Sequence, residues 1–137
     1  MSVLLLDTCA AIWLTQGEPI AAQATEAIDA CARKGAPLFV SPMSGWEIGM
    51  LVSRGRLTIT MDPEAWFERL LAVPGVALAD LNVSTLIASS FLPGAAPRDP
   101  VDRILAATAR EGGYHLVTRD RRLLDYAEEG HLSTIAC

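Results

Sequence analysis

Short apolar runs alternate with longer amphipathic or alanine-rich segments along the whole chain. The short runs are apolar on both faces, which is typical of strands buried in a parallel sheet. The longer segments hold helix-forming residues and are bounded by Ser, Asp, Pro or Gly where helices begin and end. The pattern predicts strands at residues 3–6, 38–40, 76–81, 115–117 and 133–136, and helices at 10–14, 20–33, 41–53, 62–73, 83–91, 99–112 and 120–126.

This alternation of strands and helices predicts an α/β fold with a mainly parallel sheet. The 137 residues are 51% hydrophobic, and no internal repeat, linker or low-complexity tract divides them. We therefore expect a single domain over residues 1–137 with a core of its own. The one clear loop is 92–98, which contains Pro93, Gly94 and Pro97.

The apolar runs also bear on where the protein works. None of them approaches the roughly 20 residues that span a bilayer, and the first strand follows Met1 with no export signal before it. Cys9, Cys31 and Cys137 are spaced neither as a disulfide framework nor as a zinc site. We expect a cytoplasmic protein with reduced thiols and no membrane span.

The net charge of −5 argues against a protein that grips nucleic acid over a broad basic face. Ten of the eleven cationic residues are arginines, however, and six of them gather in two regions. A local basic rim around an acidic centre is compatible with this distribution. The six are Arg54 and Arg56 in one region and Arg98, Arg103, Arg119 and Arg121 in the other.

Four acidic residues stand where predicted strands end or where the next helices begin. Asp7 and Asp120 follow apolar strands, Glu47 lies on the helix after 38–40, and Asp102 lies in the first turn after the loop. In an open parallel sheet, ligands bind beyond the carboxyl ends of the strands. The four carboxylates are therefore predicted to converge at one edge of the sheet.

Each acid also has a purely structural explanation. The stretch 99–102 can supply an N-cap, a proline at the first helical position and an acid in the first turn. Residues 44–47 fit an S-x-x-E capping box. Asp120 can cap its helix and Asp7 can be a turn residue. Such caps are common and contribute about 1 kcal/mol each.

The four acids together favour a metal site, because clustered carboxylates repel one another unless a cation neutralises them. Oxygen ligands without His or Cys favour Mg²⁺ or Mn²⁺ over zinc. Such an ion can lower the pKa of a bound water and offset the charge that builds on phosphate oxygens. Hydrolysis of a phosphate ester is one chemistry that such a site can carry out.

Four segments occur in an order and spacing that a known family shares. They are Leu4-Leu5-Leu6-Asp7-Thr8, then Ser44-Gly45-Trp46-Glu47-Ile48 with Gly55-Arg56-Leu57, then Arg98-Asp99-Pro100-Val101-Asp102-Arg103 with Ala106-Ala107-Thr108-Ala109, and Leu116-Val117-Thr118-Arg119-Asp120. In these segments the chain resembles PIN-domain proteins, specifically the toxin ribonucleases of the VapBC toxin-antitoxin class. The resemblance extends over almost the whole chain.

The resemblance implies a three-layer α/β/α fold with four or five strands and metal-dependent endonucleolytic cleavage of RNA. It also implies a homodimer and inhibition by a small antitoxin that wraps the groove and can place a basic side chain among the acids. The residues implied to bind metal and to catalyse are Asp7, Glu47, Asp102 and Asp120, with Asp99 nearby and Thr118 assisting through its hydroxyl.

Three positions depart from the family pattern. Cys9 stands where many relatives have His or Asn, Leu51 where a Lys is frequent, and Pro97 where a His is common. All four acids are present. The departures put substrate choice and the grip on RNA in doubt more than metal binding.

Arg98, Arg103 and Arg119 flank the acids and are candidates for RNA contact, because Arg suits bidentate binding of phosphate. Salt bridges to the acids, or exposure to solvent, would explain the same three residues equally well.

The remaining aromatic and imidazole side chains receive other predictions. Trp66, at helical spacing with other apolar residues, is predicted in the core. Trp13 and Trp46 are predicted as dimer or antitoxin contacts. His115 and His131 match no general-base geometry and receive no catalytic role.

Other functions remain open at this stage. The same acids would serve a PIN-type nuclease in RNA maturation or DNA-end processing, or a non-catalytic module that binds metal or protein. An aspartate-based phosphatase fits less well, because Asp7-Thr8-Cys9 lacks the second acid that such enzymes use and Lys34 is the sole lysine.

Overall fold

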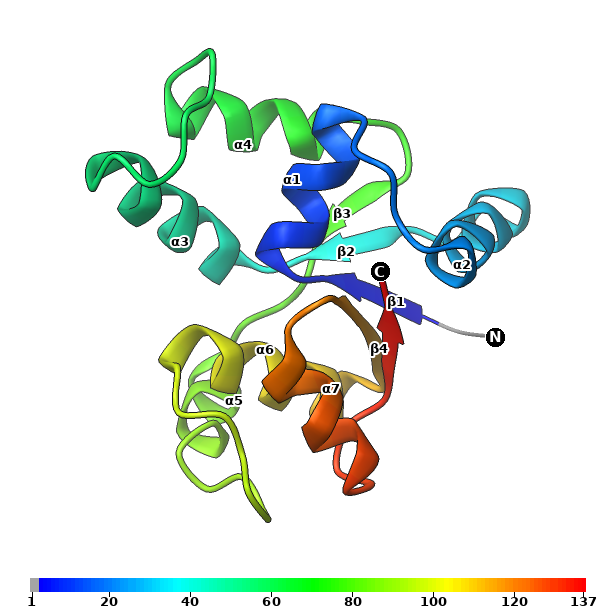
Figure 1. The fold of residues 1–137 in the computed structure, drawn as a ribbon, viewed down its shortest axis with the longest axis vertical. Helices are drawn as coiled ribbons and strands as arrows, with labels where there is room; N and C mark the ends of the chain where they lie inside the picture. Colours follow the sequence, from blue (N-terminus) through cyan, green and yellow to red (C-terminus); the bar gives the residue numbers. More distant parts are fainter. Residues whose placement is uncertain (1–2) are drawn as a thin grey trace.

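One parallel sheet of five strands organises the chain in the computed structural model, which describes residues 3–137. The strands follow the order β3-β2-β1-β4-β5, and every neighbouring pair is parallel. β1 lies in the middle and is hydrogen-bonded to β2 on one side and β4 on the other (Figure 1). The strands are β1 (Val3–Leu6), β2 (Leu38–Val40), β3 (Val76–Leu78), β4 (Tyr114–Thr118) and β5 (Thr134–Ala136).

Seven helices connect these strands and cover the sheet in the part of the chain that the structure describes. Helices α1, α2 and α4 pack on one face and α6 and α7 on the other; α5 packs on α6, and α3 lies beside the carboxyl end of β2 (Figure 1). The helices are α1 (Thr8–Gln16), α2 (Ala22–Lys34), α3 (Pro42–Ser53), α4 (Pro63–Ala72), α5 (Val83–Ala88), α6 (Pro100–Gly112) and α7 (Arg121–Glu128). The predicted α/β class with two helix layers around a parallel sheet is confirmed.

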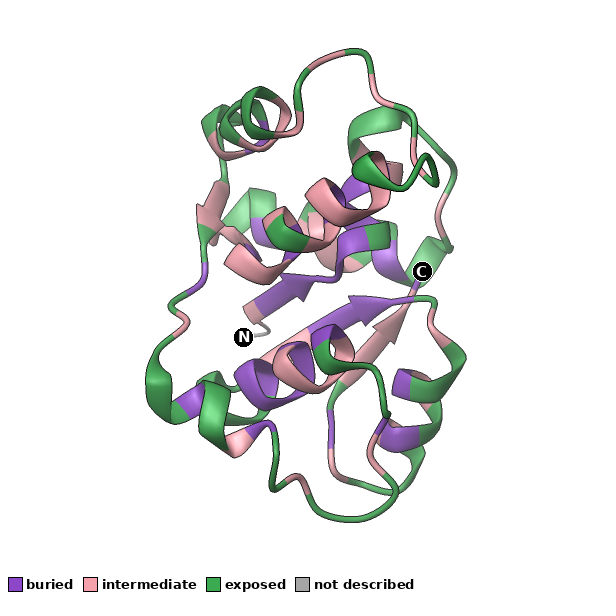
Figure 2. Ribbon diagram, turned by 90° about the vertical axis from the view of Figure 1, so that its left-hand side faces the viewer, coloured by how far each residue is buried: buried purple, intermediate pink, exposed green. Residues whose placement is uncertain are grey.

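The two faces of β1 show why both helix layers are needed. Leu4 and Leu6 point into the core shared with α1, α2 and α4, while Leu5 points into the core shared with α6 and α7. All three are at most 2% exposed, and burying such a side chain stabilises the fold by about 2 kcal/mol. Figure 2 shows the buried residues in the strands and on the inner sides of the helices.

Several predicted boundaries shift in the structure. The third strand ends at Leu78 and not at residue 81, since the chain leaves the sheet after Ala79 donates its N–H to the carbonyl of Val40. The first helix is longer than predicted, because the Asp7 side chain caps its first turn and Gly17 ends it in the left-handed conformation. α2 begins at residue 22, not 20, and α5 ends at 88, not 91.

The strand order places a crevice at one end of the sheet. From β1 the chain passes to β2 and β3 on one side, then crosses to β4 and β5 on the other. The connections that leave β1 and β4 therefore diverge, and ligands of open α/β sheets bind at such a point. Across residues 3–137, none of the helices has the length and apolar character needed to cross a membrane.

Candidate active site

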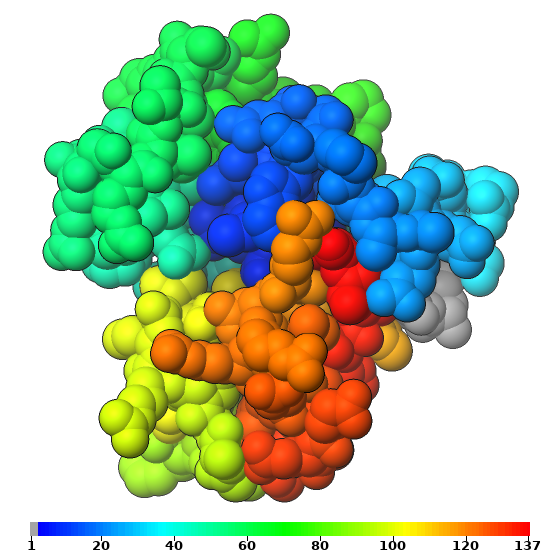
Figure 3. Space-filling model, viewed as in Figure 1, coloured from blue at the N-terminus to red at the C-terminus, as the bar shows by residue number. Residues whose placement is uncertain are grey.

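A pocket of about 310 Å³ opens at the carboxyl ends of β1 and β4. In Figure 3, the blue N-terminal segment, the yellow start of α6 and the orange start of α7 meet near the middle of one face. All four predicted acids and the accessory Asp99 contribute to its wall. The lining residues are Asp7, Thr8, Cys9, Trp13, Glu47, Asp99, Asp102, Leu105, Arg119 and Asp120.

Asp7 is fixed from both sides at the end of β1. Its Oδ1 accepts a hydrogen bond from the Ala10 N–H at 2.7 Å, which caps α1, and its Oδ2 accepts one from the Thr118 hydroxyl at 2.5 Å. The Thr118 oxygen accepts in turn from the Asp120 N–H at 3.0 Å. The hydroxyl of Thr118 thus joins the ends of β1 and β4 and orients two of the four acids.

The Asp7 carboxyl is 6% exposed, and its environment resists ionisation. Burial raises its pKa from 3.8 to about 6. The hydrogen bonds from Thr118 and Ala10 lower the pKa, while the negative charges of Glu47 and Asp120 raise it further. A positive charge in the pocket would favour the ionised form.

Asp102 lies in the first turn of α6, but the cap of that helix is Asp99. Asp99 Oδ1 accepts from the Val101 N–H at 2.8 Å and the Asp102 N–H at 3.2 Å. The Asp102 carboxylate is therefore left to face the pocket. Its pKa rises from 3.8 to about 7, chiefly through burial and then through Asp120, Asp99 and the other acids.

Asp120 is both a helix cap and a residue of the acidic pocket, the two roles that the sequence offered for it. Its Oδ1 caps α7 by accepting from the Arg122 N–H at 2.9 Å and the Leu123 N–H at 3.2 Å. The same residue lines the pocket. A helix cap and a place in an acidic site are thus compatible, because one carboxylate oxygen suffices for the cap.

The capping-box explanation of Glu47 is wrong. The cap of α3 is Ser41, whose hydroxyl accepts from the Met43 N–H at 3.0 Å. The Ser44 hydroxyl instead accepts from the Thr8 hydroxyl at 2.9 Å. Glu47 therefore lies beyond the first turn of α3, and its carboxylate lines the acidic pocket.

No basic side chain neutralises these acids through an ion pair in the described structure. The ion pairs among residues 3–137 join Arg121 to Asp125 and Glu129 to His131, away from the pocket. No three His, Cys, Asp or Glu side chains in that range yet stand close enough to hold one ion. The all-oxygen donor set and its uncompensated negative charge are nonetheless the ligand chemistry that a hard divalent cation prefers.

The three candidate arginines occupy different places. Arg119 lines the pocket; its guanidinium carbon lies 3.9 Å from the centre of the Trp13 ring, and its Nε donates to the Cys137 carbonyl. Arg98 is exposed. Arg103 turns away and donates to the carbonyls of Ser89 and Pro97, both at 2.9 Å. None of the three forms a salt bridge with the acids within residues 3–137.

Other pocket residues carry weaker sequence signals. Thr8 follows Asp7 and could have been suspected, whereas Leu105 is one apolar residue among many on α6. Burial, together with the charge of Asp7 and the other acids, raises the pKa of the Cys9 thiol to about 11, so it stays protonated. Trp66 packs against the core as predicted, and Trp13 is half-buried against the same core.

A family model described as PIN domain matches residues 4–129. The chain belongs to the PIN-domain family. Ribonuclease VapC22 of Mycobacterium tuberculosis (strain ATCC 25618 / H37Rv) is 32% identical to this PIN domain over 124 residues, which are 90% of this chain and 91% of that protein. The resemblance to PIN-domain proteins read from the sequence is thereby confirmed.

Solved structures share the fold of this PIN domain. VapBC2 from Rickettsia felis, bound to a DNA fragment from its promoter, matches with a TM-score of 0.67 and 14% identity over 98% of each chain. FitAcB from Neisseria gonorrhoeae matches with a TM-score of 0.58 and 16% identity over 97% of this chain and 96% of that one. The three-layer architecture is therefore that of these structures.

Proposed function

We propose that this PIN domain is a Mg²⁺- or Mn²⁺-dependent endoribonuclease that acts as a toxin and is held in check by an antitoxin. The observation that carries the proposal is the pocket itself. Four carboxylates from four separate segments line it without an ion pair among the described residues, and burial raises the pKa of two of them. The name of the relative from Mycobacterium tuberculosis, a ribonuclease, supports RNA as substrate.

Asp7, Glu47, Asp102 and Asp120 would hold the cation. When bound, such an ion supplies an activated water and offsets the negative charge that develops on the phosphate. The Thr118 hydroxyl keeps the Asp7 carboxylate oriented towards the pocket through its hydrogen bond.

The substrate side of the site would rest on Arg119. Its guanidinium is held by the Trp13 ring and the Cys137 carbonyl at the rim of the pocket. It therefore presents a positive charge to a phosphate at little cost in side-chain entropy.

Two partners are proposed as well. The structure of VapBC2 shares the fold of this domain, and VapBC is the toxin-antitoxin class that the sequence resembles, which supports a cognate antitoxin. A homodimer would cover the apolar side chains of α5 and the turn after it, where Val83 is 70%, Ile87 57% and Phe91 79% exposed. An RNA substrate fits action in the cytoplasm.

The test is cleavage of a mixed cellular RNA pool by the purified protein with Mg²⁺ or Mn²⁺, with EDTA, and with the Asp102→Asn variant. Cleavage that requires both the cation and Asp102 supports the proposal. Absence of cleavage in every condition, or cleavage of DNA in place of RNA, contradicts it. Growth arrest by the wild type but not by Asp7→Asn would separate a toxin from a maturation nuclease.

A further inference from the structure

The 92–98 loop, between α5 and α6, contains no helix or strand. It leads directly into Asp99 at the wall of the acidic pocket. Backbone-to-backbone bonds end at Phe91 and resume at Arg103. Within the described structure, the hydrogen bonds to the loop backbone come from three side chains, Arg103, Tyr126 and Glu129. These hydrogen bonds, together with the packing of Leu92 and Ala96 against the core, hold the loop in its course.

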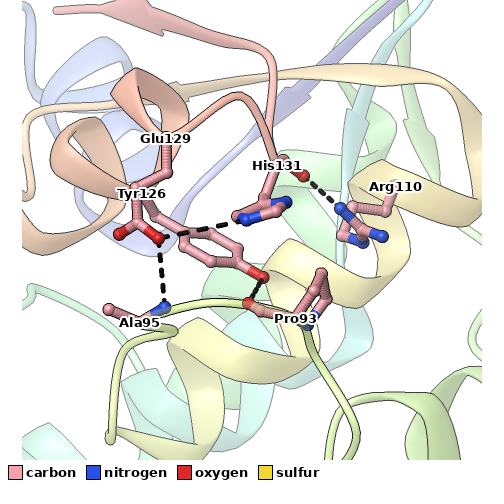
Figure 4. Close-up of polar contacts among 6 residues, drawn as sticks. All are labelled: Pro93, Ala95, Arg110, Tyr126, Glu129 and His131. Carbon is pink, nitrogen blue, oxygen red and sulfur yellow. Dashed lines mark hydrogen bonds and ion pairs between the residues drawn. The ribbon is translucent and has the colours of Figure 1, made fainter.

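Two of these side chains come from the end of α7, where Tyr126 lies in the last turn and Glu129 is the C-cap. The buried Tyr126 donates its hydroxyl to the Pro93 carbonyl at 2.6 Å. Glu129 Oε1 accepts from the Ala95 N–H at 3.1 Å and lies 4.0 Å from the His131 Nε2. Figure 4 shows that Tyr126 and Glu129 reach the loop from the same corner, which is formed by Tyr126, Glu129 and His131 at and just after the end of α7.

The corner itself is secured to α6. Arg110, on α6, donates from Nη1 to the His131 carbonyl at 2.5 Å, and the Tyr126 and His131 rings lie 5.3 Å apart between centroids. The helix that carries Asp102 and the corner that holds the loop are thus one connected unit (Figure 4).

Gly94 shows how closely the loop lies against this corner. Its φ is +66°, and a Cβ added there would stand 2.6 Å from Glu129 Oε1 and 2.7 Å from the His131 ring. Real Cβ atoms do not approach so closely. A Cβ at residue 94 would therefore displace either the loop or the ends of the Glu129 and His131 side chains, and either shift disturbs the Ala95–Glu129 hydrogen bond.

From this geometry we infer that Tyr126 and Glu129 are positioning residues for the acidic pocket. They hold the 92–98 loop in place, Arg103 fixes its last turn at Pro97, and Asp99 then caps α6 with Asp102 facing the pocket. The inference rests on the proposed metal-dependent function. Neither residue lines the pocket, so each acts through the loop.

A purely structural role would give a different result from a positioning role. If the corner only stabilises the fold, breaking it lowers the melting temperature and leaves the affinity of the folded protein for metal unchanged. If it positions Asp99 and Asp102, metal affinity falls as well. Loss of ligand orientation commonly costs about 10-fold in metal affinity or more.

The experiment measures Mn²⁺ affinity by calorimetry and amide exchange of residues 92–102 in Glu129→Ala and Glu129→Gln. Gln keeps an oxygen that accepts from Ala95 but loses the charge. We expect Glu129→Ala to bind Mn²⁺ about 10-fold more weakly with faster exchange, and Glu129→Gln to stay within about twofold of wild type. Equal weakening in both variants would mean that only the charge matters and would overturn the inference.

A second pair of variants keeps every charge. Gly94→Ala and Gly35→Ala both place alanine at a positive φ, +66° and +69°, but a Cβ at residue 35 meets nothing within 4 Å. Both variants lose a similar amount of stability from the strained backbone, which lowers the melting temperature of both alike. Only Gly94→Ala is expected to weaken Mn²⁺ binding, again about 10-fold. Equal Mn²⁺ affinity in the two variants would overturn the inference.

The wild type separates this inference from the proposed function. Mn²⁺ binding and RNA cleavage by the wild type, with unchanged affinity in Glu129→Ala and Gly94→Ala, would refute the inference alone. Mn²⁺ binding without RNA cleavage would refute the proposed function, and the variant affinities would still decide the role of the corner. No Mn²⁺ binding by the wild type would overturn both.

Discussion

Replacing Asp102 with Asn is predicted to stabilise the metal-free protein while weakening its response to Mn²⁺. The Asp102 carboxyl faces the pocket among other acids, and its pKa is raised to about 7. It makes no capping bond of its own, because Asp99 caps α6. An amide at residue 102 would remove the charge with little change in shape.

The sign and size of the change in stability follow from the pKa of Asp102 in the folded and in the unfolded state. Because the folded pKa of Asp102 lies above the unfolded value of 3.8, the folded state binds the proton more tightly. Below about pH 4 the carboxyl is protonated in both the folded and the unfolded state and costs no stability. As the pH rises from about 4 to 7, ionisation of Asp102 progressively destabilises the folded state. Each pH unit between the two pKa values corresponds to about 1.4 kcal/mol, which sets a ceiling of about 4 kcal/mol.

The measurable gain is smaller than this ceiling. Salt and water in the open pocket screen part of the repulsion. The variant also loses an attraction to the N-terminus of α6 worth up to about 1 kcal/mol. We expect a net gain of about 2 kcal/mol at pH 7.5, or roughly 6 °C in melting temperature for a domain of this size.

The assay is thermal unfolding in EDTA and in saturating Mn²⁺, at pH 4.5 and pH 7.5. In EDTA the Asp102→Asn variant should melt above wild type at pH 7.5 and close to it at pH 4.5. At 100 times its dissociation constant Mn²⁺ should stabilise the wild type by about 2.7 kcal/mol, and the variant by much less. A variant that melts at or below wild type at pH 7.5 in EDTA would refute the electrostatic reasoning.

A matched control tests whether removing an acidic side chain outside the pocket raises the melting temperature as well. Glu64 lies in the first turn of α4 and is exposed, away from the pocket. Glu64→Gln should leave the melting temperature unchanged or slightly lower and should keep the full response to Mn²⁺. An equal gain in this control would assign the effect to net charge, not to the pocket.

Three further predictions concern separate parts of the molecule. Thr118→Val removes the hydroxyl between Asp7 and the Asp120 N–H; it should cost about 1–3 kcal/mol in urea unfolding and weaken Mn²⁺ binding, and unchanged binding would contradict its orienting role. Arg119→Ala should raise KM for RNA with unchanged Mn²⁺ affinity, and a KM equal to wild type would remove Arg119 from the substrate site. Ile87→Asp on the exposed face of α5 should convert a dimer to a monomer by light scattering, and a dimer of unchanged mass would exclude this face as the interface.

The meeting of the acids in one pocket could be predicted where the residue type and its place after a strand sufficed. Asp7 and Asp120 line the same pocket because they follow β1 and β4, and strands of a parallel sheet end at one edge. The capping-box explanation of 44–47 failed because a capping box depends on which residue is the cap. The preceding Ser41 takes that position, and Thr8, far away in the sequence, engages Ser44.

The arginines show that a position next to an acid in the sequence does not predict which side chain lines the pocket. Arg103 follows Asp102 directly, yet its side chain is taken up by the carbonyls of Ser89 and Pro97. A long flexible side chain has many neighbours within reach, and the nearest unsatisfied carbonyls decide its direction. No periodicity in the sequence could distinguish Arg103 from Arg119, which lines the pocket.

By itself, the sequence determined the order and kind of the elements and the residues that end each strand. Strands that are apolar on both faces can bury both faces only between two layers of helices, and capping residues mark where helices start. Local chemistry is therefore enough to predict the kind and the order of the elements. Only the tertiary structure decided which helices cover which face, which residues besides the acids line the pocket, and that Tyr126 and Glu129 hold the 92–98 loop. Those outcomes depend on contacts between residues distant in the chain, where burial and hydrogen bonding are settled by packing and not by neighbours in sequence.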